Sequence, residues 1–217
     1  LFDLPIAIAY LIASGEIEGN NDTIYVGELG LDGSLRPVRG VLNIVMTAKN
    51  NGYKQIIVPW GNAQEAGLID GIEVYPAKNL GEVIRHVHQT HAEHKLLPIQ
   101  PITDLESDNW ADGQVVLEDI KGQESAKRAL TIAAAGRHNV ILVGPPGTGK
   151  TMLARAFQGL LPSLSREDTL AVTAIYSTVS TNHTLTTRPP FRAPHHTASH
   201  TALVGGGSQP KPGEVTL

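Results

Sequence analysis

A glycine-rich stretch, VILVGPPGTGKT, occupies residues 140–151 and has the residue types and spacing of a phosphate-binding loop. It satisfies the pattern G-x-x-x-x-G-K-[ST], in which glycines let backbone N–H groups turn inward around a phosphate at a helix N-terminus. We expect Lys150 to reach the β- and γ-phosphates of a nucleotide and the Thr151 hydroxyl to bind Mg²⁺. The predicted site consists of Gly144, Pro145, Pro146, Gly147, Thr148, Gly149, Lys150 and Thr151.

The residues on either side of this loop fit the same interpretation. Residues 139–143 are an apolar run typical of a buried strand, and residues 152–157 have the pattern of a helix start. A phosphate-binding loop lies between a strand and a helix. The context therefore favours a nucleotide site over a glycine turn that carries a lysine by accident.

The 66 residues that follow Thr151 offer few groups for hydrolysis. Glu167 and Asp168 do not follow an apolar strand, and Glu214 precedes only three residues. Phosphoryl transfer to water needs a carboxylate that orders the water and a positive group that stabilises charge on the γ-phosphate. We expect this chain to bind the nucleotide without turning it over.

Composition limits the remaining possibilities. The chain has 217 residues, of which 41% are hydrophobic and 18% charged, so it can bury one or two cores. A formal charge of −4 argues against a nucleic-acid footprint over the whole surface but leaves a local basic patch open. The absence of cysteine excludes disulfides and thiolate metal sites and fits a cytoplasmic protein. No apolar run approaches the roughly 18 residues of a membrane span.

The pattern along the chain predicts two modules. We expect an α/β domain over residues 1–94, a linker over 95–112 and a nucleotide-binding module over 113–217. In the first module, helices and strands alternate, which indicates a largely parallel sheet. The expected helices are a buried one at 5–14, an amphipathic one at 41–51, one whose start is capped by Asn62 and Glu65, and one at 80–91. The expected strands are 23–31, which turns at 32–33 into 34–38, then 55–59 and 71–77.

Both modules resemble a known family. Residues 26–84, from VGELGLDGSLRPVRG to NLGEVI, are similar to the proteolytic-type domain of Lon, in the variant carried by magnesium chelatase-like ATPases of the ComM/YifB type. Residues 119–162, from DIKGQ to GLLP, and 188–217, from RPPFRAPHH to GEVTL, are similar to the AAA+ module of that family. The similarity covers nearly the whole chain.

The resemblance carries expectations about fold and function. It implies an α/β protein with a Lon-like domain followed by the first part of a P-loop AAA+ core, in a chain truncated at both ends, just before the acidic strand. It also implies ATP and Mg²⁺ as cofactors, a homo-hexameric ring, and action on DNA as a branch-migration helicase in natural transformation or recombination. Ile120, in DIKGQ, is the side chain expected to line the adenine.

Two other functions remain open at this point. One is a chelatase-type motor that remodels a partner enzyme for magnesium insertion. The other is an ATP-dependent protease, which needs a serine activated by a lysine. The resemblance places Leu42 at the lysine position, and residues 2–4 near the serine segment offer no hydroxyl, while Ser14 and Lys49 lie elsewhere. We therefore expect the Lon-like domain to be non-proteolytic.

Two histidine groups and one set of cations complete the candidates. His86, His88, His91 and His94 could ligate a metal, although an exposed helix end is the favoured interpretation. His195, His196 and His200 lie in a Pro- and Gly-rich segment, 188–211, which is either a loop facing the pore of a ring or a structural insert. Arg188, Arg192 and Lys211 occur there with no acidic residue between them and are the candidate DNA contacts.

Overall fold

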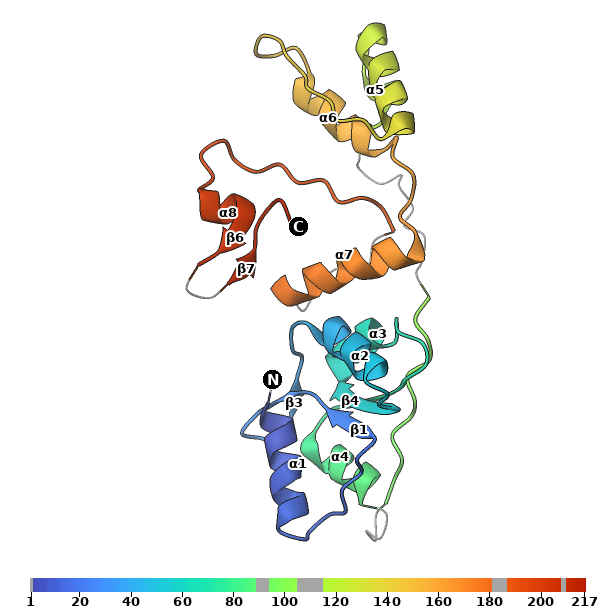
Figure 1. The fold of residues 1–217 in the computed structure, drawn as a ribbon, viewed down its shortest axis with the longest axis vertical. Coiled ribbons are helices and arrows are strands. Elements are labelled where there is room, and N and C mark those ends of the chain that lie inside the picture. Colours follow the sequence, from blue (N-terminus) through green and yellow to red (C-terminus); the bar gives the residue numbers. More distant parts are fainter. Residues whose placement is uncertain (1, 89–93, 105–114, 181–186, 208–209) are drawn as a thin grey trace. The chain divides into compact units, whose positions relative to one another are not determined.

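The computed structural model describes residues 2–88, 94–104, 115–180, 187–207 and 210–217. The chain forms two compact units (Figure 1). Unit 1 comprises residues 1–105 together with 170–184, and unit 2 comprises residues 106–169 together with 185–217. Each unit is described by itself.

Unit 1 is built on a parallel sheet of three strands, as the alternation of helices and strands predicted. Strands β1 (Thr23–Tyr25), β4 (Gln55–Pro59) and β5 (Glu73–Ala77) lie in the order β1-β4-β5. The expected strand at 23–31 is divided, because β2 (Glu28–Leu29) leaves this sheet and pairs with β3 (Leu35–Arg36) in an antiparallel hairpin. The hairpin turns at the expected Asp-Gly pair.

Helices cover both faces of the sheet (Figure 1). On one face lie α1 (Asp3–Ala13) and α4 (Leu80–Val87), and on the other lie α2 (Val41–Asn50) and the short α3 (Ala63–Ala66), which follows the 3₁₀ turn η1 (Trp60–Asn62). Successive side chains of a strand point to opposite faces, so a strand between two helical layers must be apolar throughout. The predicted run QIIVP meets this requirement as β4.

The face of the sheet that α1 covers is closed by apolar packing. Ile57 of β4 and Tyr75 of β5 pack with Leu4 and Ile8 of α1 in one buried cluster. The prediction of a buried helix at 5–14 was wrong for the other side of α1, where Tyr10 is 71% exposed. When a helix is apolar on all sides, its sequence does not show which side will pack against the sheet.

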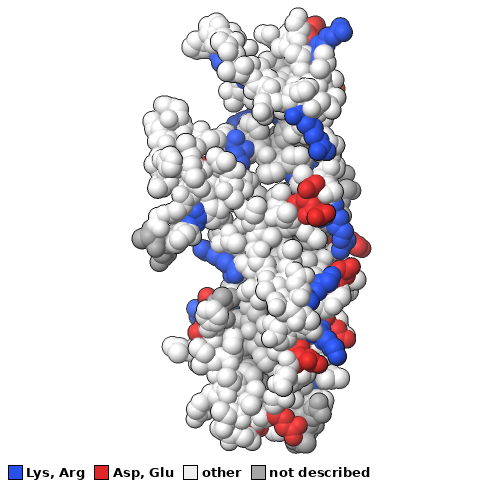
Figure 2. Space-filling view, in the orientation of Figure 1, with Lys and Arg blue, Asp and Glu red and all other residues white. Residues whose placement is uncertain are grey.

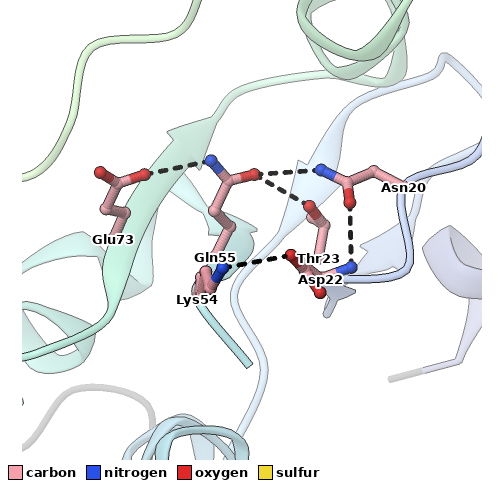
Figure 3. A network of polar contacts seen from close by, with 6 residues as sticks. All are labelled: Asn20, Asp22, Thr23, Lys54, Gln55 and Glu73. Atoms are coloured by element: carbon pink, nitrogen blue, oxygen red, sulfur yellow. Dashed lines mark hydrogen bonds and ion pairs between the residues drawn. The ribbon is translucent and has the colours of Figure 1, made fainter. Parts of the chain in front are cut away.

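Polar side chains tie together the amino ends of the three parallel strands (Figure 3). The Gln55 side chain accepts hydrogen bonds from Thr23 Oγ1 at 3.0 Å and Asn20 Nδ2 at 3.4 Å, and donates to Glu73 Oε2 at 3.1 Å. Lys54 forms an exposed ion pair with Asp22 at 3.7 Å. The polar row fixes the strand register at this edge, where the sheet meets solvent.

Residues 95–104, expected as the start of a linker, run along unit 1 and are hydrogen-bonded to it. The Leu97 N–H donates to His86 Nδ1 at 3.1 Å, the Gln100 N–H to the Val74 carbonyl at 2.8 Å, and the Thr103 N–H to the Gly67 carbonyl at 2.9 Å. The remaining expected linker residues, 105–112, lie outside the described part of the chain. The domain boundaries drawn from the sequence stay a prediction.

In unit 2, Ile120, Leu130, Leu153 and Ala156 form a small apolar cluster. The elements of unit 2 are the 3₁₀ turn η2 (Leu117–Asp119), α5 (Glu124–Gly136), α6 (Lys150–Gln158), the beginning of α7 (Arg166–Val179), α8 (His200–Val204), β6 (Gly205–Gly206) and β7 (Lys211–Pro212). Helix α7 starts in unit 2, and its residues from Leu170 onward belong to unit 1. In the described part of the Pro- and Gly-rich segment 188–211, the regular elements are the one-turn helix α8, the strand β6 and the first residue of β7.

The prediction of a buried strand at 139–143 was wrong for this structure. These residues form no strand, and Ile141 and Val143 are 86% and 87% exposed. A strand needs a neighbour to accept its backbone hydrogen bonds. In the described part of unit 2 the only strand pairing is the short β6–β7 hairpin, so nothing pairs with this run. The apolar pattern indicates a propensity for strand formation, but it does not show whether a neighbouring strand is present to pair with.

Among the residues that the structure describes, no helix combines the length and the apolar character needed to cross a membrane.

Candidate nucleotide site

The phosphate-binding pattern folds as a loop that leads into α6. Gly147 and Gly149 have φ angles of +81° and +84°, in the left-handed region that side chains with a Cβ rarely adopt. A Cβ at either position would meet nothing within 4 Å, so the glycines are required by conformation rather than by crowding. The two left-handed residues turn the chain sharply just before the helix, which is the geometry that directs backbone N–H groups at an anion.

The Lys150 side chain folds back over the loop. Its Nζ donates to the carbonyl oxygens of Gly144 at 2.9 Å and Pro145 at 2.7 Å. The Thr148 hydroxyl also donates to the Pro145 carbonyl, at 2.9 Å, which closes the loop on itself. The ammonium group is thereby held at the loop, where a phosphate would be its natural counter-ion.

Helix α6 begins at Lys150, and Thr151 lies in its first turn. The first N–H groups of a helix have no acceptor within the helix and carry the positive end of its dipole. Backbone N–H groups, one ammonium and one hydroxyl therefore converge on a single short segment. This donor set fits the phosphates of a nucleotide and a Mg²⁺ ion bound to them.

Ile120, the expected adenine contact, is buried with 7% exposure and packs in the cluster that includes Leu153 of α6. The two residues before α5, Gly122 and Gln123, have φ angles of +69° and +60°. A non-glycine residue in the left-handed region is uncommon and often marks a functional or sharply constrained turn. The assignment of Ile120 to the adenine remains a prediction, because no contact in the structure tests it.

The acidic residues after the loop are engaged elsewhere. The Asp168 carboxylate accepts a hydrogen bond from Ser165 Oγ at 2.7 Å, and the Asp168 N–H donates to the same Oγ at 3.1 Å, so Ser165 caps the start of α7. Glu214 accepts two from Arg192, at 2.7 Å from Nε and 2.6 Å from Nη2. The Arg192 guanidinium lowers the pKa of the Glu214 carboxyl below its usual value. That neither side chain serves the nucleotide stays a prediction.

The same ion pair changes the reading of the candidate DNA contacts. The sequence has no acidic residue between Arg188 and Lys211, yet the fold brings Glu214 onto Arg192. The charge of Arg192 is therefore locally compensated. Lys211 lies exposed in β7, and Arg188 is half-buried. On the face shown in Figure 2, Lys and Arg side chains are interspersed with Asp and Glu rather than gathered into one basic field.

Comparison with known proteins gives the same family over both ends of the chain. A family profile described as "Magnesium chelatase, subunit ChlI" matches residues 116–217, and one described as "Subunit ChlI of Mg-chelatase" matches residues 1–62. The chain is 45% identical over 221 residues to the Escherichia coli protein YifB and 43% identical over 222 residues to the competence protein ComM of Haemophilus influenzae. Both alignments include all of this chain, which spans 42% and 43% of those relatives.

The chain belongs to the magnesium chelatase-like family. An archaeal Lon protease from Halobacterium salinarum is also similar, at 33% identity over 117 residues, which is 52% of this chain and 16% of that protein. The fold is a Lon-like α/β domain followed by part of a P-loop core, as the resemblance implied.

The Lon-like domain of this magnesium chelatase-like chain does not assemble a serine–lysine pair from its candidates. Leu42 is fully buried at the start of α2. The Ser14 hydroxyl, at the C-terminus of α1, donates to the Leu11 carbonyl at 3.0 Å, and Lys49 pairs with Asp70 at 3.0 Å. A serine nucleophile needs its base within hydrogen-bond reach. Each candidate is engaged with a different partner.

The histidines form no metal centre among the residues that the structure describes. His91 lies outside them. His86 stacks on Tyr75 with ring centroids 4.5 Å apart, and its Nδ1 accepts the Leu97 N–H. Burial, with a smaller contribution from His94, lowers the pKa of His86 below its usual value. His195 and His196 stack on each other at 4.2 Å, and His200 starts α8.

Sequence analysis missed the true roles of Asn62 and Glu65. They were expected to cap a helix, but the Asn62 side chain makes no cap bond. Asn62 instead binds both backbone polar groups of Val38, accepting from its N–H at 3.0 Å and donating to its carbonyl at 2.9 Å. Glu65 accepts the Leu42 N–H at 3.1 Å. Both partners lie more than 20 residues away, so no local signal could have found them.

Proposed function

We propose that this chain binds Mg-ATP through the loop at 144–151 and forms the nucleotide-binding end of an AAA+ motor. The observation that carries the proposal is the joint geometry of the loop: two left-handed glycines, a lysine held over the loop and a threonine in the first turn of α6. The family assignment supports nucleotide use in general. ATP supplies the phosphoanhydride bond whose cleavage would drive the motor.

Each residue of the loop has a separate task in this proposal. The backbone N–H groups between Gly144 and Gly149 hold the β-phosphate, and the helix dipole of α6 favours its negative charge. Lys150 exchanges its two loop carbonyls for phosphate oxygens, which are stronger, charged acceptors. Thr151 holds Mg²⁺, and Ile120 contributes apolar surface to the adenine. None of these tasks requires Glu167, Asp168 or Glu214.

The full-length protein is proposed to act on DNA as a branch-migration helicase in the cytoplasm, assembled as a homo-hexameric ring. The similarity to a protein named for competence supports a DNA-related role. Within this chain, Arg188 and Lys211 are the proposed phosphate contacts, and Arg192 can join them only if its pairing with Glu214 is exchanged for a phosphate. DNA contacts of this kind weaken with salt because binding releases counterions.

A chelatase-type motor is the second candidate, because the family profiles are named for a magnesium chelatase subunit. Such a motor would be stimulated by a partner enzyme and not by DNA. A proteolytic function is disfavoured by the buried Leu42 and by the separate pairing of Ser14 and Lys49.

ATPase assays of the full-length protein separate these candidates. We expect turnover that depends on Lys150 and rises when branched DNA is added, with a smaller rise for blunt duplex. ATP turnover that depends on Lys150 but does not change when DNA is added would contradict the helicase proposal. The proposal of an ATP-driven motor would still stand.

A further inference from the structure

The carboxyl ends of two neighbouring strands in unit 1 bring an exposed indole and a lysine together. Trp60 directly follows β4 and Lys78 directly follows β5, two parallel strands whose last residues, Pro59 and Ala77, are paired in register. The Lys78 Nζ lies 4.7 Å from the centroid of the Trp60 ring, and Trp60 is 53% exposed. Ligands of open α/β sheets bind outside the carboxyl ends of the strands. This edge is therefore a natural place for a binding site.

A hollow of about 210 Å³ lies at this edge, and all of its lining residues belong to unit 1. Beside Trp60, it is lined by three cations, Lys78, Arg85 and Lys95, and by the carboxylate of Glu82. The other described residues that line it are leucines and prolines. We call it the Trp60 hollow. Its described lining carries three positive charges against one negative charge, in a chain whose formal charge is −4.

Backbone hydrogen bonds fix the chain around the Trp60 hollow. The Lys95 N–H donates to the Arg85 carbonyl at 3.1 Å, which holds these two cations on adjacent segments. The Lys78 N–H donates to Glu82 Oε2 at 2.7 Å, so the carboxylate already accepts a backbone donor. Among the residues that the structure describes, no ion pair engages the three cations. Their charge is available to an anion from outside.

An aromatic face beside several cations is the combination that binds single-stranded nucleic acid. Every base has a π-face that stacks on an aromatic side chain, and the phosphates pair with lysine and arginine. An acidic peptide offers the charge without the flat ring, and in a duplex the bases are already stacked on one another. The volume lies below the roughly 300–1,000 Å³ of pockets that enclose small molecules, so the hollow fits one part of a longer ligand.

We propose that the Trp60 hollow binds single-stranded nucleic acid, with one base stacked on Trp60 and the adjacent phosphates on its three cations. A cation–π contact at an exposed site is weak. The base therefore takes the place of the Lys78 ammonium over the indole, and the ammonium moves to a phosphate. The site is separate from the loop at 144–151 and from the segment 188–211, and its use in the full-length protein rests on the proposed action on DNA.

Binding of a labelled strand to the 217-residue chain tests the stacking. The probe is a fluorescein-labelled oligothymidylate of about 12 nucleotides, followed by fluorescence anisotropy. We expect Trp60→Ala to weaken binding on the order of tenfold, because a base loses its stacking partner. Trp60→Phe, which keeps a ring, should bind nearly as the unmodified chain does. The control Tyr10→Ala removes a ring that is 71% exposed elsewhere in unit 1 and should leave the affinity unchanged.

The salt dependence of the same binding tests the phosphate contacts. Each phosphate contact on a single strand contributes about 0.7 to the slope of log affinity against log salt. Lys78→Ala/Lys95→Ala should therefore make the slope shallower by about 1.4. The matched control is Lys49→Ala/Lys54→Ala, which removes two lysines of unit 1 that pair with aspartates, and it should leave the slope nearly unchanged.

Four results would overturn the proposal: no binding of the strand by the unmodified chain, equal affinity of Trp60→Ala, an unchanged slope for Lys78→Ala/Lys95→Ala, or displacement of the strand by an equal concentration of oligoglutamate. The last result would identify an acidic peptide as the ligand. The ATPase assay of the full-length protein with and without DNA judges the proposed function separately. A protein stimulated by DNA whose Trp60→Ala variant binds the strand normally would keep that function and lose this site.

Discussion

Asn62 gives the sharpest test of how the Lon-like unit is held together. The side chain is 1% exposed and bridges both the N–H and the carbonyl of Val38, 24 residues earlier in the chain. Replacing Asn62 by Ala leaves these two buried groups unsatisfied, at about 1–3 kcal/mol each. We expect the free energy of unfolding of unit 1 to fall by about 3–5 kcal/mol, which includes a small contribution from the cavity.

The companion substitution Asn62→Asp separates this role from the helix cap that the sequence suggested. Asp is as good a helix cap as Asn, so a capping role predicts almost no change. In the observed geometry, the new carboxylate would turn an acceptor toward the Val38 carbonyl and lie beside Glu65, which is 3.4 Å from the present Nδ2. We therefore expect Asn62→Asp to cost at least as much stability as Asn62→Ala.

Urea unfolding followed by circular dichroism measures both changes, with Asn51→Ala as the control. The Asn51 side chain is exposed and bonds only to a carbonyl of its own helix, so its loss should change stability by less than about 0.5 kcal/mol. If Asn62→Asp left the free energy of unfolding unchanged and Asn62→Ala lowered it by only about 1 kcal/mol, the capping interpretation would hold and the bridge to Val38 would be refuted.

Three further outcomes follow from other sites. Because burial lowers the pKa of His86, the folded state favours the neutral imidazole. The stability that His86 contributes is therefore present above about pH 6.5 and is lost as the pH falls toward the folded pKa of this side chain. An NMR titration of His86 with a midpoint at or above 6.5 would contradict this. The double variant Arg188→Ala/Arg192→Ala of the full-length protein should bind branched DNA more weakly and with a shallower salt slope, and an unchanged slope would make the 188–211 segment structural. No serine of the chain should react with a fluorophosphonate, because a reactive serine needs a lysine base and the buried Leu42 occupies the position expected for that lysine. Stoichiometric labelling of any serine would contradict this.

The parts of the fold that sequence predicts are those whose physical cause is local. Strand β4 is apolar at nearly every position because both of its faces are covered, and the loop at 144–151 must place its glycines and lysine at fixed spacing to surround a phosphate. Helix α2 likewise follows from the amphipathic period of its residues.

The errors arose where a distant segment decides. Asn62 and Glu65 have the spacing of a helix start, but their partners, Val38 and Leu42, come from another part of the chain. Arg192 looked uncompensated until the fold placed Glu214 beside it. The apolar run at 139–143 has the composition of a strand, but a strand also needs a neighbour, which composition cannot provide.

The most direct test of the central claim is the affinity of the 217-residue chain for Mg-ATP, measured by calorimetry with and without Lys150→Ala. Charge-assisted hydrogen bonds from the ammonium contribute about 1.5–3 kcal/mol, so the variant should bind about 10- to 100-fold more weakly. Lys54→Ala, which removes an exposed lysine from unit 1, should bind as the unmodified chain does. Equal affinities for the unmodified chain and Lys150→Ala would contradict the assignment of this loop as the nucleotide site.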